Sequence, residues 1–530
     1  MKEAATIADA FVTAAMLYPD KEAIVYQSRR LTYKDAYAQV CRLSNLLIAN
    51  GASVGSKIGI QLPRSPEYIL AYFAAAMAGA VIVPLGPNLT PREAYSVLNY
   101  CDVQMLISSA EQLDHLDDIA LGCQQLQAVF IIEERDPNEL ADQSRTVVSS
   151  PATLKCILID ERLDSIPEIP PNIMLDPDSL ALLLHTSGTT SAPKRVMLSH
   201  RNVLASARSH IASLNLGHED KVLIALPMFF GYCNTAQLVT HILLGGTLVL
   251  MDSTFTPSKF CRIVQAERIT TFTGVPTMLL YLLAFRHFHN YDLSSLRYIC
   301  FGGSTMPYER IAQLAELLPT VGFVQTYGQT EASPRVTALL PDDIHRKCGS
   351  VGKAIPGVQV SICDESGARL PPLQVGEVVV CGENVMLGYY KRPEVTQEVL
   401  RQGYLYTGDM GYLDDEEYLY LVGRRKNIII RGGMNIYPEE IEEYLLEHPA
   451  VAEAVVVGEA HPLQGEAPVA LIVLRADATM SAEEIIAYCK AGLMSYKIPM
   501  RVEFRTELPK TYNQKIQRHA LVAKQDKQHD

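Results

Sequence analysis

The stretch "SLALLLHTSGTTSAPKRVMLSH" (179–200) decides the fold class, because a hydroxyl-rich loop follows an apolar run of strand length. The loop, 185–194, holds threonines, serines, one glycine and one lysine. The segment 196–210 after it is interpreted as a helix start. A polar loop between a buried strand and a helix predicts an α/β protein, in which ligands bind beyond the carboxyl ends of the strands.

Apolar runs of the same kind recur along the chain, separated by helical patterns. Valine, isoleucine and leucine dominate them, which is typical of strands that are buried on both faces. Strands that alternate with helices predict parallel sheets whose faces are covered. The predicted strands are 57–62, 103–109, 128–132, 221–227, 247–251, 270–276 and 296–303.

The pattern changes twice in the second half of the chain. From about Ser333, short alternating strands with many Gly and Pro turns predict a small, mostly antiparallel β-barrel or sandwich. After "GRRKNIIIRGG" (423–433), helical and strand patterns predict a small α+β unit of about a hundred residues. A chain of 530 residues is too long for a single core, so several compact units are expected.

Composition excludes several classes of function. A net charge of −13 without a long Lys/Arg run disfavours nucleic acid or an anionic membrane as the main partner. Eleven dispersed cysteines, with no CxxC pair, indicate reduced thiols in a cytosolic protein. The N-terminal segment predicts an amphipathic helix, not a secretory signal. Segment 68–86 lacks charge, but Gly79 interrupts it, so we expect a buried helix and a short strand instead of a membrane span.

The loop 186–194 has a composition suited to phosphates. Glycine permits close approach of the backbone, hydroxyls donate to oxygens and the lysine supplies positive charge. The loop does not match G-x-x-x-x-G-K-[ST], the Walker A pattern. From this loop alone, an ordinary solvated Ser/Thr turn is an equally good interpretation.

Three further motifs follow the loop. They are "TYGQTEASP" (326–334), "YLYTGDMGYLDDEEYLYLVGRRKNIIIRGGMNIYPEEIE" (404–442) and "LPKTYNQKIQRHAL" (508–521). Together with "HTSGTTSAPKRVMLSH" (185–200), they resemble, in order and spacing, the motifs of the adenylate-forming superfamily. This superfamily comprises acyl-CoA synthetases, luciferases and the adenylation domains of peptide synthetases. The resemblance spans essentially the whole chain.

The resemblance implies an architecture of two domains. The large N-terminal domain, 1–423, would hold two αβ-layered parallel-sheet subdomains and a small β-barrel at about 333–420. A hinge at 424–427 would connect it to a small, mobile α+β domain at 428–530.

The resemblance also implies a reaction in two halves. A carboxylate attacks the α-phosphate of ATP to give acyl-AMP, and a pantetheine thiol then displaces AMP to give a thioester. ATP, Mg²⁺ and CoA, or the phosphopantetheine of a carrier protein, are the implied cofactors. Hydrogen-bond donors, a metal and a cation should converge on the phosphates, where negative charge gathers.

Residues at the matching positions take the roles of the family's nucleotide site. Glu331 is the implied Mg²⁺ ligand, since a carboxylate is a hard oxygen donor, and Thr330 lies beside it on the α-phosphate. Tyr327 is expected to stack on adenine, and Gly328 to let the backbone come close. The β- and γ-phosphates are assigned to Thr186, Ser187, Gly188, Thr189, Thr190 and Lys194.

The ribose and hinge residues come from the third motif. Asp409 is the implied ribose ligand, because a carboxylate accepts from both hydroxyls of a cis-diol, and Arg424 is the second contact there. Lys426 takes the hinge position, about which the C-terminal domain rotates between the two half-reactions.

Each pose of that domain would bring different residues to the active site. One pose brings Lys515, the implied catalytic lysine, to the α-phosphate and the attacking carboxylate. The other brings Gly432 and Gly433, which suit a loop passing close to a pantetheine arm. Lys510 lies five residues before Lys515, and the motif order favours Lys515.

The sequence departs from the family pattern at four places. Ser191 and Arg195 stand where the phosphate loop usually has glycine, and Gln514 replaces the glycine before the catalytic lysine. Each replacement is expected to cost some loop freedom. The fourth departure is Phe230, which stands where many acyl-CoA synthetases have the histidine of Pro-x-x-His.

The substrate pocket is expected at Phe230, Gly302 and Ser304, with Gly303 beside the adenine site. No acidic residue occurs between Leu223 and Val249, so a substrate ammonium group would be buried unpaired. An uncharged aliphatic or aryl carboxylic acid is therefore preferred over an α-amino acid. The "FF" run at 229–230 is also consistent with ordinary core packing.

The leading functional hypothesis is an acyl-CoA or aryl-CoA ligase. The alternative is a stand-alone enzyme that loads an acyl or aryl group onto a carrier protein. An oxygenase similar to luciferase is a third possibility, which nothing in the sequence demands. A non-enzymatic adenylate-binding protein would retain the nucleotide motifs without needing Lys515. A soluble, cytoplasmic enzyme is expected.

Overall fold

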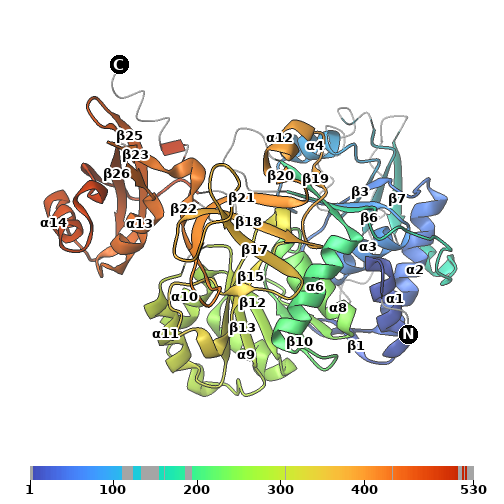
Figure 1. Ribbon diagram of the computed structural model, residues 1–530. Helices are drawn as coiled ribbons and strands as arrows, with labels where there is room; N and C mark the ends of the chain where they lie inside the picture. The colour runs from blue at the N-terminus through green and yellow to red at the C-terminus, as the bar shows by residue number, and fades with distance from the viewer. Residues whose placement is uncertain are drawn as a thin grey trace.

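The structure is a computed structural model that describes residues 4–109, 123, 125–132, 154–159, 161–185, 194–304, 306–432, 434–510, 516–518 and 520–521. Two large sheets, a smaller antiparallel sheet and a C-terminal α+β unit build the molecule (Figure 1). All eleven cysteines are free thiols. Among the helices of the described residues, none is long and apolar enough to cross a membrane.

The first large sheet has nine strands in the order β16-β15-β14-β13-β12-β10-β11-β1-β2. The strands from β14 to β1 are parallel, and the pairings toward both edges are antiparallel. The strand predictions at 221–227, 247–251, 270–276 and 296–303 are confirmed here. The bounds are β1 Glu22–Tyr26, β2 Arg29–Thr32, β10 Lys221–Ile224, β11 Thr247–Leu250, β12 Thr271–Gly274, β13 Tyr298–Gly302, β14 Gly322–Tyr327, β15 Thr337–Leu339 and β16 Lys353–Ala354.

The second large sheet has eight strands in the order β19-β9-β8-β4-β3-β5-β6-β7. The strands from β8 to β7 are parallel, whereas β9 pairs antiparallel with both β8 and β19. The strand predictions at 57–62, 103–109 and 128–132 are confirmed. The bounds are β3 Lys57–Gln61, β4 Val81–Pro84, β5 Met105–Ser109, β6 Ala128–Ile132, β7 Lys155–Ile159, β8 Leu180–His185, β9 Arg195–Ser199 and β19 Gly388–Tyr389.

Helices cover both large sheets. One shared core joins the facing sides of the two sheets through α1, α2, α3, α6 and α8. Two further cores lie on the outer sides, under α9 to α11 on the first sheet and under α4 on the second. The bounds are α1 Ile7–Leu17, α2 Tyr33–Ala49, α3 Pro66–Met77, α4 Pro91–Tyr100, α6 His200–Leu214, α8 Thr240–Leu244, α9 Pro257–Glu267, α10 Pro276–Ala284 and α11 Tyr308–Leu317.

The uncharged segment 68–86 folds as expected. Helix α3 ends at Met77, and Gly79 adopts a φ of 74° that turns the chain into β4. Helix α3 is buried on all sides, which explains why its sequence lacks a polar face.

The prediction that a helix directly follows the phosphate loop is wrong, because β9 comes first. Val196 and Leu198 are fully buried, and β9 hydrogen-bonds to strands on both of its sides. Helix α6 begins only at His200, where Ser199 and Asn202 form a capping box. Arg195 therefore lies in a strand, paired with His185, so it costs the loop no freedom.

The small antiparallel sheet has the order β17-β18-β21-β20, and β22 pairs with β21. Its first strand begins at Val358, not near Ser333, because β15 and β16 extend the first large sheet instead. The bounds are β17 Val358–Cys363, β18 Gly376–Gly382, β20 Leu400–Arg401, β21 Tyr404–Leu413 and β22 Leu419–Arg424.

The C-terminal unit has cores of its own and stands apart at one side of the molecule (Figure 1). Helices α13 and α14 pack on a sheet in the order β24-β23-β26-β25, with β27 on β26. The bounds are β23 Ile429–Arg431, β24 Met434–Ile436, α13 Pro438–Glu447, β25 Val451–His461, β26 Gly465–Leu474, α14 Ala482–Gly492 and β27 Arg501–Phe504. The α+β prediction for this segment is confirmed.

Candidate active site

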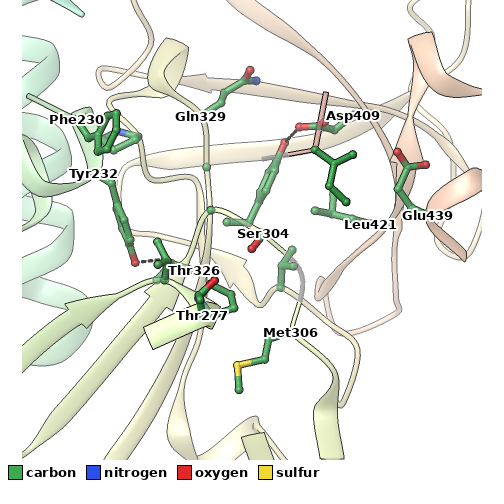
Figure 2. A pocket seen from close by; sticks show the side chains of 18 of the residues that line it. Phe230, Tyr232, Thr277, Ser304, Met306, Thr326, Gln329, Asp409, Leu421 and Glu439 are labelled. Atoms are coloured by element: carbon green, nitrogen blue, oxygen red, sulfur yellow. Dashed lines mark hydrogen bonds between the residues drawn. The ribbon is translucent and has the colours of Figure 1, made fainter. Parts of the chain in front are cut away.

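A large cleft opens beyond the carboxyl ends of β13 and β14, between the first sheet, the small antiparallel sheet and the C-terminal unit. Residues from all the sequence motifs line it. Figure 2 shows Phe230, Tyr232 and Thr326 on one side of this cleft and Asp409 and Glu439 on the other. Parallel strands deliver their following loops to one edge of the sheet, which is why motifs far apart in sequence meet here.

Three residues form a connected group at the predicted ribose site. The Tyr327 hydroxyl donates to Oδ2 of Asp409 at 2.7 Å, drawn dashed in Figure 2. Nε of Arg424 lies 2.8 Å from Oδ1 of the same carboxylate, because Asp409 and Arg424 are partners in the β21–β22 ladder. Asp409 raises the pKa of Arg424, and burial with Asp409 raises that of Tyr327. The carboxylate is thus held in one orientation at the cleft wall.

A second group joins the two residues predicted to meet the phosphates and the metal. The Tyr389 hydroxyl donates to Oε1 of Glu331 at 2.8 Å, and Nζ of Lys194 lies 4.8 Å from the centre of the Tyr389 ring. Tyr389 lies on β19, which pairs with β9. Strand β9 begins at Arg195, directly after Lys194. Burial and the Glu331 carboxylate raise the pKa of Tyr389. Tyr389 therefore links the cation and the carboxylate.

Further predicted site residues lie at the ends of β13 and β14. Thr330 opens a short 3₁₀ turn over Thr330–Ala332 that also contains Glu331. Gly328 is required by the fold itself, because a Cβ there would collide with the Pro334 carbonyl. A Cβ on Gly302 would lie 2.5 Å from the Thr326 carbonyl oxygen. The glycines thus allow β13 and β14 to end close together at the cleft.

Gly303 and Ser304 continue β13 into the cleft. Both residues are exposed and line it, and Gly303 has a φ of +89°. The roles predicted for them, Gly303 beside the adenine and Ser304 in the substrate pocket, stay predictions.

Phe230, which is predicted to lie in the substrate pocket, lines the cleft. Its ring centre lies 4.4 Å from that of Phe229, and both rings line the cleft, so the pair is not simply buried core. Tyr232 follows, with its hydroxyl 2.8 Å from Oγ1 of Thr326 (Figure 2). The sequence did not single out Tyr232 or Thr326 as pocket residues.

The predicted hinge, 424–427, begins at Arg424, which pairs with Asp409 at the predicted ribose site. Lys426 sits in the 3₁₀ turn Arg425–Asn427, and burial, with the charges of Arg424 and Lys194, lowers its pKa. Lys426 is thus close both to the group around Asp409 and to the group around Lys194 and Glu331. Gly432 is exposed with a φ of 56°, in the tight turn between β23 and β24.

Several predicted site residues lie outside the described residues. They are Thr186, Ser187, Gly188, Thr189 and Thr190 of the phosphate loop, Gly433 and Lys515. The flanks of both segments are described. Strands β8 and β9 enclose the loop, and an isolated β-bridge joins Lys510 to Ile516. Lys510 itself forms a 2.7 Å ion pair with Glu453 in the C-terminal unit, and the choice of Lys515 over Lys510 stays a prediction.

The chain carries two regions that match known protein families. The AMP-binding enzyme profile matches residues 11–390, and the AMP-binding enzyme C-terminal domain profile matches residues 440–515. The chain belongs to the AMP-binding enzymes. The predicted membership of the adenylate-forming superfamily is confirmed.

Relatives of this AMP-binding enzyme match over nearly its whole length. A long-chain-fatty-acid–CoA ligase of Bacillus subtilis (strain 168) is 33% identical over 545 residues, which cover 99% of this chain and 95% of the relative. A feruloyl-CoA synthase of Amycolatopsis sp. is 33% identical over 505 residues, 95% and 96% of the two chains. The solved o-succinylbenzoate CoA synthetase of Bacillus subtilis, in complex with its acyl-adenylate intermediate, is 30% identical with a TM-score of 0.82, and each chain is covered to 97%.

Two residues of this AMP-binding enzyme that the sequence analysis missed position the site. Tyr389 holds Glu331, as described above. Glu377 accepts from the Gly408 amide at 3.0 Å and from Arg425 at 2.9 Å, so it ties β21 next to Asp409 to the turn Arg425–Asn427. Both residues lie outside the recognised motifs, and only strand pairing brings them to the cleft.

Proposed function

We propose that this AMP-binding enzyme is a carboxylate–CoA ligase that forms AMP. In the first half-reaction, an oxygen of the substrate carboxylate attacks the α-phosphorus of ATP. The bond from that phosphorus to the bridging oxygen breaks, and pyrophosphate leaves. In the second half-reaction, the sulfur of CoA attacks the acyl carbon and AMP departs with the bonding electron pair, while the thiol proton is lost.

One observation carries this proposal: motif residues from four separate parts of the chain line a single cleft. Lys194 and Glu331 would meet the phosphates at one place, and Asp409 with Arg424 would meet the ribose at another. Fixed charges that converge where negative charge develops lower the barrier without reorganisation. The relatives named above as CoA ligases and synthetases support the same reaction.

The residues present fit a magnesium ion that is bound mainly through phosphates. Among the described residues no group of three or more His, Cys, Asp or Glu side chains could hold a metal. One oriented carboxylate, Glu331, together with substrate oxygens, is the arrangement that Mg²⁺ commonly adopts. When bound, Mg²⁺ neutralises charge on the phosphates. Tyr389 would hold the Glu331 carboxylate in place for it.

The C-terminal unit is proposed to serve both half-reactions. The unit joins the large domain at Lys426, which is close to Arg424 and Lys194. A rotation about this residue would exchange the residues of the C-terminal unit that face the cleft. In one orientation Lys515 would neutralise the attacking carboxylate and the α-phosphate. In the other, Gly432 and Gly433 would flank the pantetheine arm. This division places the large domain at 1–423, the hinge at 424–427 and the small domain at 428–530.

An aliphatic or aryl carboxylic acid is the proposed substrate class, with CoA as acceptor. Phe229, Phe230 and Met306 give the acyl side of the cleft an apolar wall. Free thiols throughout the chain support the cytoplasm as the compartment.

The test is pyrophosphate release from Mg²⁺-ATP over a panel of fatty, aryl and amino acids, with and without CoA. We expect release that requires a carboxylic acid without an amino group and that turns over faster with CoA. A single turnover unaffected by CoA would indicate loading of a carrier protein instead. Binding of ATP without release for any acid would contradict the ligase assignment.

A further inference from the structure

The chain directly after the predicted catalytic lysine is held in place by the C-terminal unit. Lys515 lies outside the described residues, but Ile516, the next residue, is described. Ile516 forms a β-bridge with Lys510 and packs against the core that contains Leu508 and Leu521. The position of the chain on the carboxyl side of Lys515 is therefore set by packing.

Arg518 anchors this segment to α13 and β25. Nη2 of Arg518 donates to Oε2 of Glu442 at 2.6 Å, and Nη1 contacts Oε1 of the same carboxylate. Nη1 also donates to the Val456 carbonyl at 2.7 Å, and the Val456 amide donates to Glu442 at 2.6 Å. A guanidinium that binds both oxygens of one carboxylate is fixed in direction as well as in place. The chain is thus anchored three residues beyond Lys515.

The pair of Arg518 and Glu442 is largely shielded from water. Only 21% of the arginine side chain and 12% of the glutamate side chain are exposed. Burial raises the pKa of Glu442, and the charge of Arg518 opposes that rise. Salt screens a partly buried pair less than a surface pair, and removal of one partner leaves the other charge uncompensated. This anchor is therefore firmer than an ordinary ion pair at the surface.

Glu439 connects the same arginine to the predicted hinge. Its Oε1 accepts from Nδ2 of Asn427 at 2.7 Å and from Nη2 of Arg518 at 3.3 Å. Asn427 directly follows Lys426. A Cβ on Gly423 of β22 would lie 2.5 Å from Oε2 of Glu439, so the carboxylate packs against the small antiparallel sheet. Figure 2 shows this carboxylate at the cleft, where it joins the hinge and the arginine.

We propose that Arg518 is a positioning residue for acyl-AMP formation, because its pairing with Glu442 and Glu439 holds the chain next to Lys515 at a fixed place on the C-terminal unit. This inference rests on the proposed ligase function and on the role proposed there for Lys515. The arginine acts through the lysine and not on the substrate. The thioester half-reaction would use the turn at Gly432 instead, so it does not depend on this anchor.

The test measures the two half-reactions separately, with the carboxylic acid that gives the fastest pyrophosphate release. Acyl-AMP formation is followed as single-turnover release without CoA, and thioester formation starts from supplied acyl-AMP and CoA. We expect Arg518→Met to slow acyl-AMP formation by about 10- to 100-fold, since a small misplacement of a catalytic group costs that much. Thioester formation should stay within about twofold of wild type. Arg518→Lys keeps a point charge without the two-pronged contact, so a loss of about 3- to 10-fold is expected.

Three further variants separate positioning from folding. Arg518→Met leaves Glu442 without its partner, so the double variant Arg518→Met/Glu442→Gln removes both charges and should show the same defect. In Lys515→Ala, the addition of Arg518→Met should slow acyl-AMP formation no further, because the arginine acts through the lysine. Arg501→Met removes an arginine that pairs with Glu459 elsewhere in the same unit, so both half-reactions should persist.

Equal losses in both half-reactions would show that Arg518 only stabilises the C-terminal unit, and would overturn the proposal. A wild-type rate of acyl-AMP formation in Arg518→Met would overturn it as well, as would a further loss when Arg518→Met is added to Lys515→Ala. Each of these results leaves the ligase function standing, because pyrophosphate release by the wild-type enzyme is measured first. Absence of that release with every acid would instead reject the ligase function, and this inference with it.

Discussion

The phenol of Tyr327 and the carboxylate of Asp409, which are 82 positions apart in the chain, are joined by a 2.7 Å hydrogen bond at the wall of the cleft. Tyr327 ends a strand of the first large sheet, and Asp409 belongs to the small antiparallel sheet. The bond therefore fixes two sheets to each other at the predicted nucleotide site. It also commits one oxygen of Asp409 to the protein, and Arg424 engages the other.

Replacing Asp409 with asparagine should weaken ATP use. The amide cannot accept hydrogen bonds as strongly as a carboxylate, and bonds to charged groups are worth about 1.5–3 kcal/mol. We expect kcat/KM for ATP to fall about 10- to 100-fold, with most of the change in KM, measured by ATP–pyrophosphate exchange. Asp178→Asn, which removes an exposed partner of Arg201, should remain within twofold of wild type. Equal losses in both variants would contradict a ribose role for Asp409.

Tyr389→Phe should alter the response to Mg²⁺. The lost hydrogen bond orients Glu331, so the Mg²⁺ concentration for half-maximal activity should rise by about 3- to 10-fold while the rate at saturation is retained. Glu331→Gln should raise it further. Because the tyrosine acts through the glutamate, adding Tyr389→Phe to Glu331→Gln should change nothing more. Additive effects of the two substitutions would show that Tyr389 acts independently of Glu331.

Lys515→Ala should slow the first half-reaction and spare the second, and Lys510→Ala serves as its control. We expect Lys515→Ala to lower acyl-AMP formation on the order of 100- to 1,000-fold, because it would remove the charge proposed to act in the transition state. Thioester formation from pre-made acyl-AMP should continue at nearly the wild-type rate. Lys510→Ala only breaks an ion pair with Glu453 at the surface of the C-terminal unit, so both steps should persist. A Lys510→Ala variant with the larger adenylation defect would reverse the assignment.

Acid should destabilise the large domain through buried histidines. The pKa of His200 and of His241 is lowered by burial to about 4, against 6.5 when exposed. Between these values the unfolded chain binds more protons, so stability falls as pH drops from about 6.5 toward 4. Each histidine should contribute a loss of about 3 kcal/mol at pH 4.

The measurement is urea denaturation between pH 7 and pH 4. His241→Gln should flatten the pH dependence, because the neutral amide does not titrate. The exposed His218 offers a matched control, and His218→Gln should leave the slope unchanged. A wild-type slope in His241→Gln would rule out this residue as a source of acid sensitivity.

The central strands of the two large sheets were predictable because they are buried on both faces, unlike the edge strands β2, β7 and β16. Burial on both faces requires unbroken runs of Val, Ile and Leu, and such runs can be recognised in a short stretch of sequence. Strand β9 was missed because "RVMLS" is short and directly precedes a helix whose own pattern overlaps it. Its strand character comes from pairing with β8 and with β19, and β19 lies almost 200 positions away in the chain. No local pattern contains that information.

The residues predicted to bind the nucleotide could be named because they occur in contiguous motifs. Asp409 and Arg424 were named in advance, and the ladder pairs them directly. Tyr389 and Glu377 were not, because each acts through a neighbour that only the tertiary fold supplies, and neither was the burial of Arg335. An arginine in a sequence is ordinarily a surface residue, so the burial of Arg335 could not be inferred from its type.

Strand β9 imposes a limit on how this enzyme can evolve. Its backbone is hydrogen-bonded on both sides, and it sets the register of Lys194 at one end and of Tyr389 across the ladder. Deleting or inserting a single residue within β9 would turn its side chains to the opposite face and separate Lys194 from Tyr389. Substitutions in the preceding loop leave that register intact. A substitution just before β9, such as Ser191 in place of glycine, therefore keeps the register of the strand. An insertion or deletion within β9 does not.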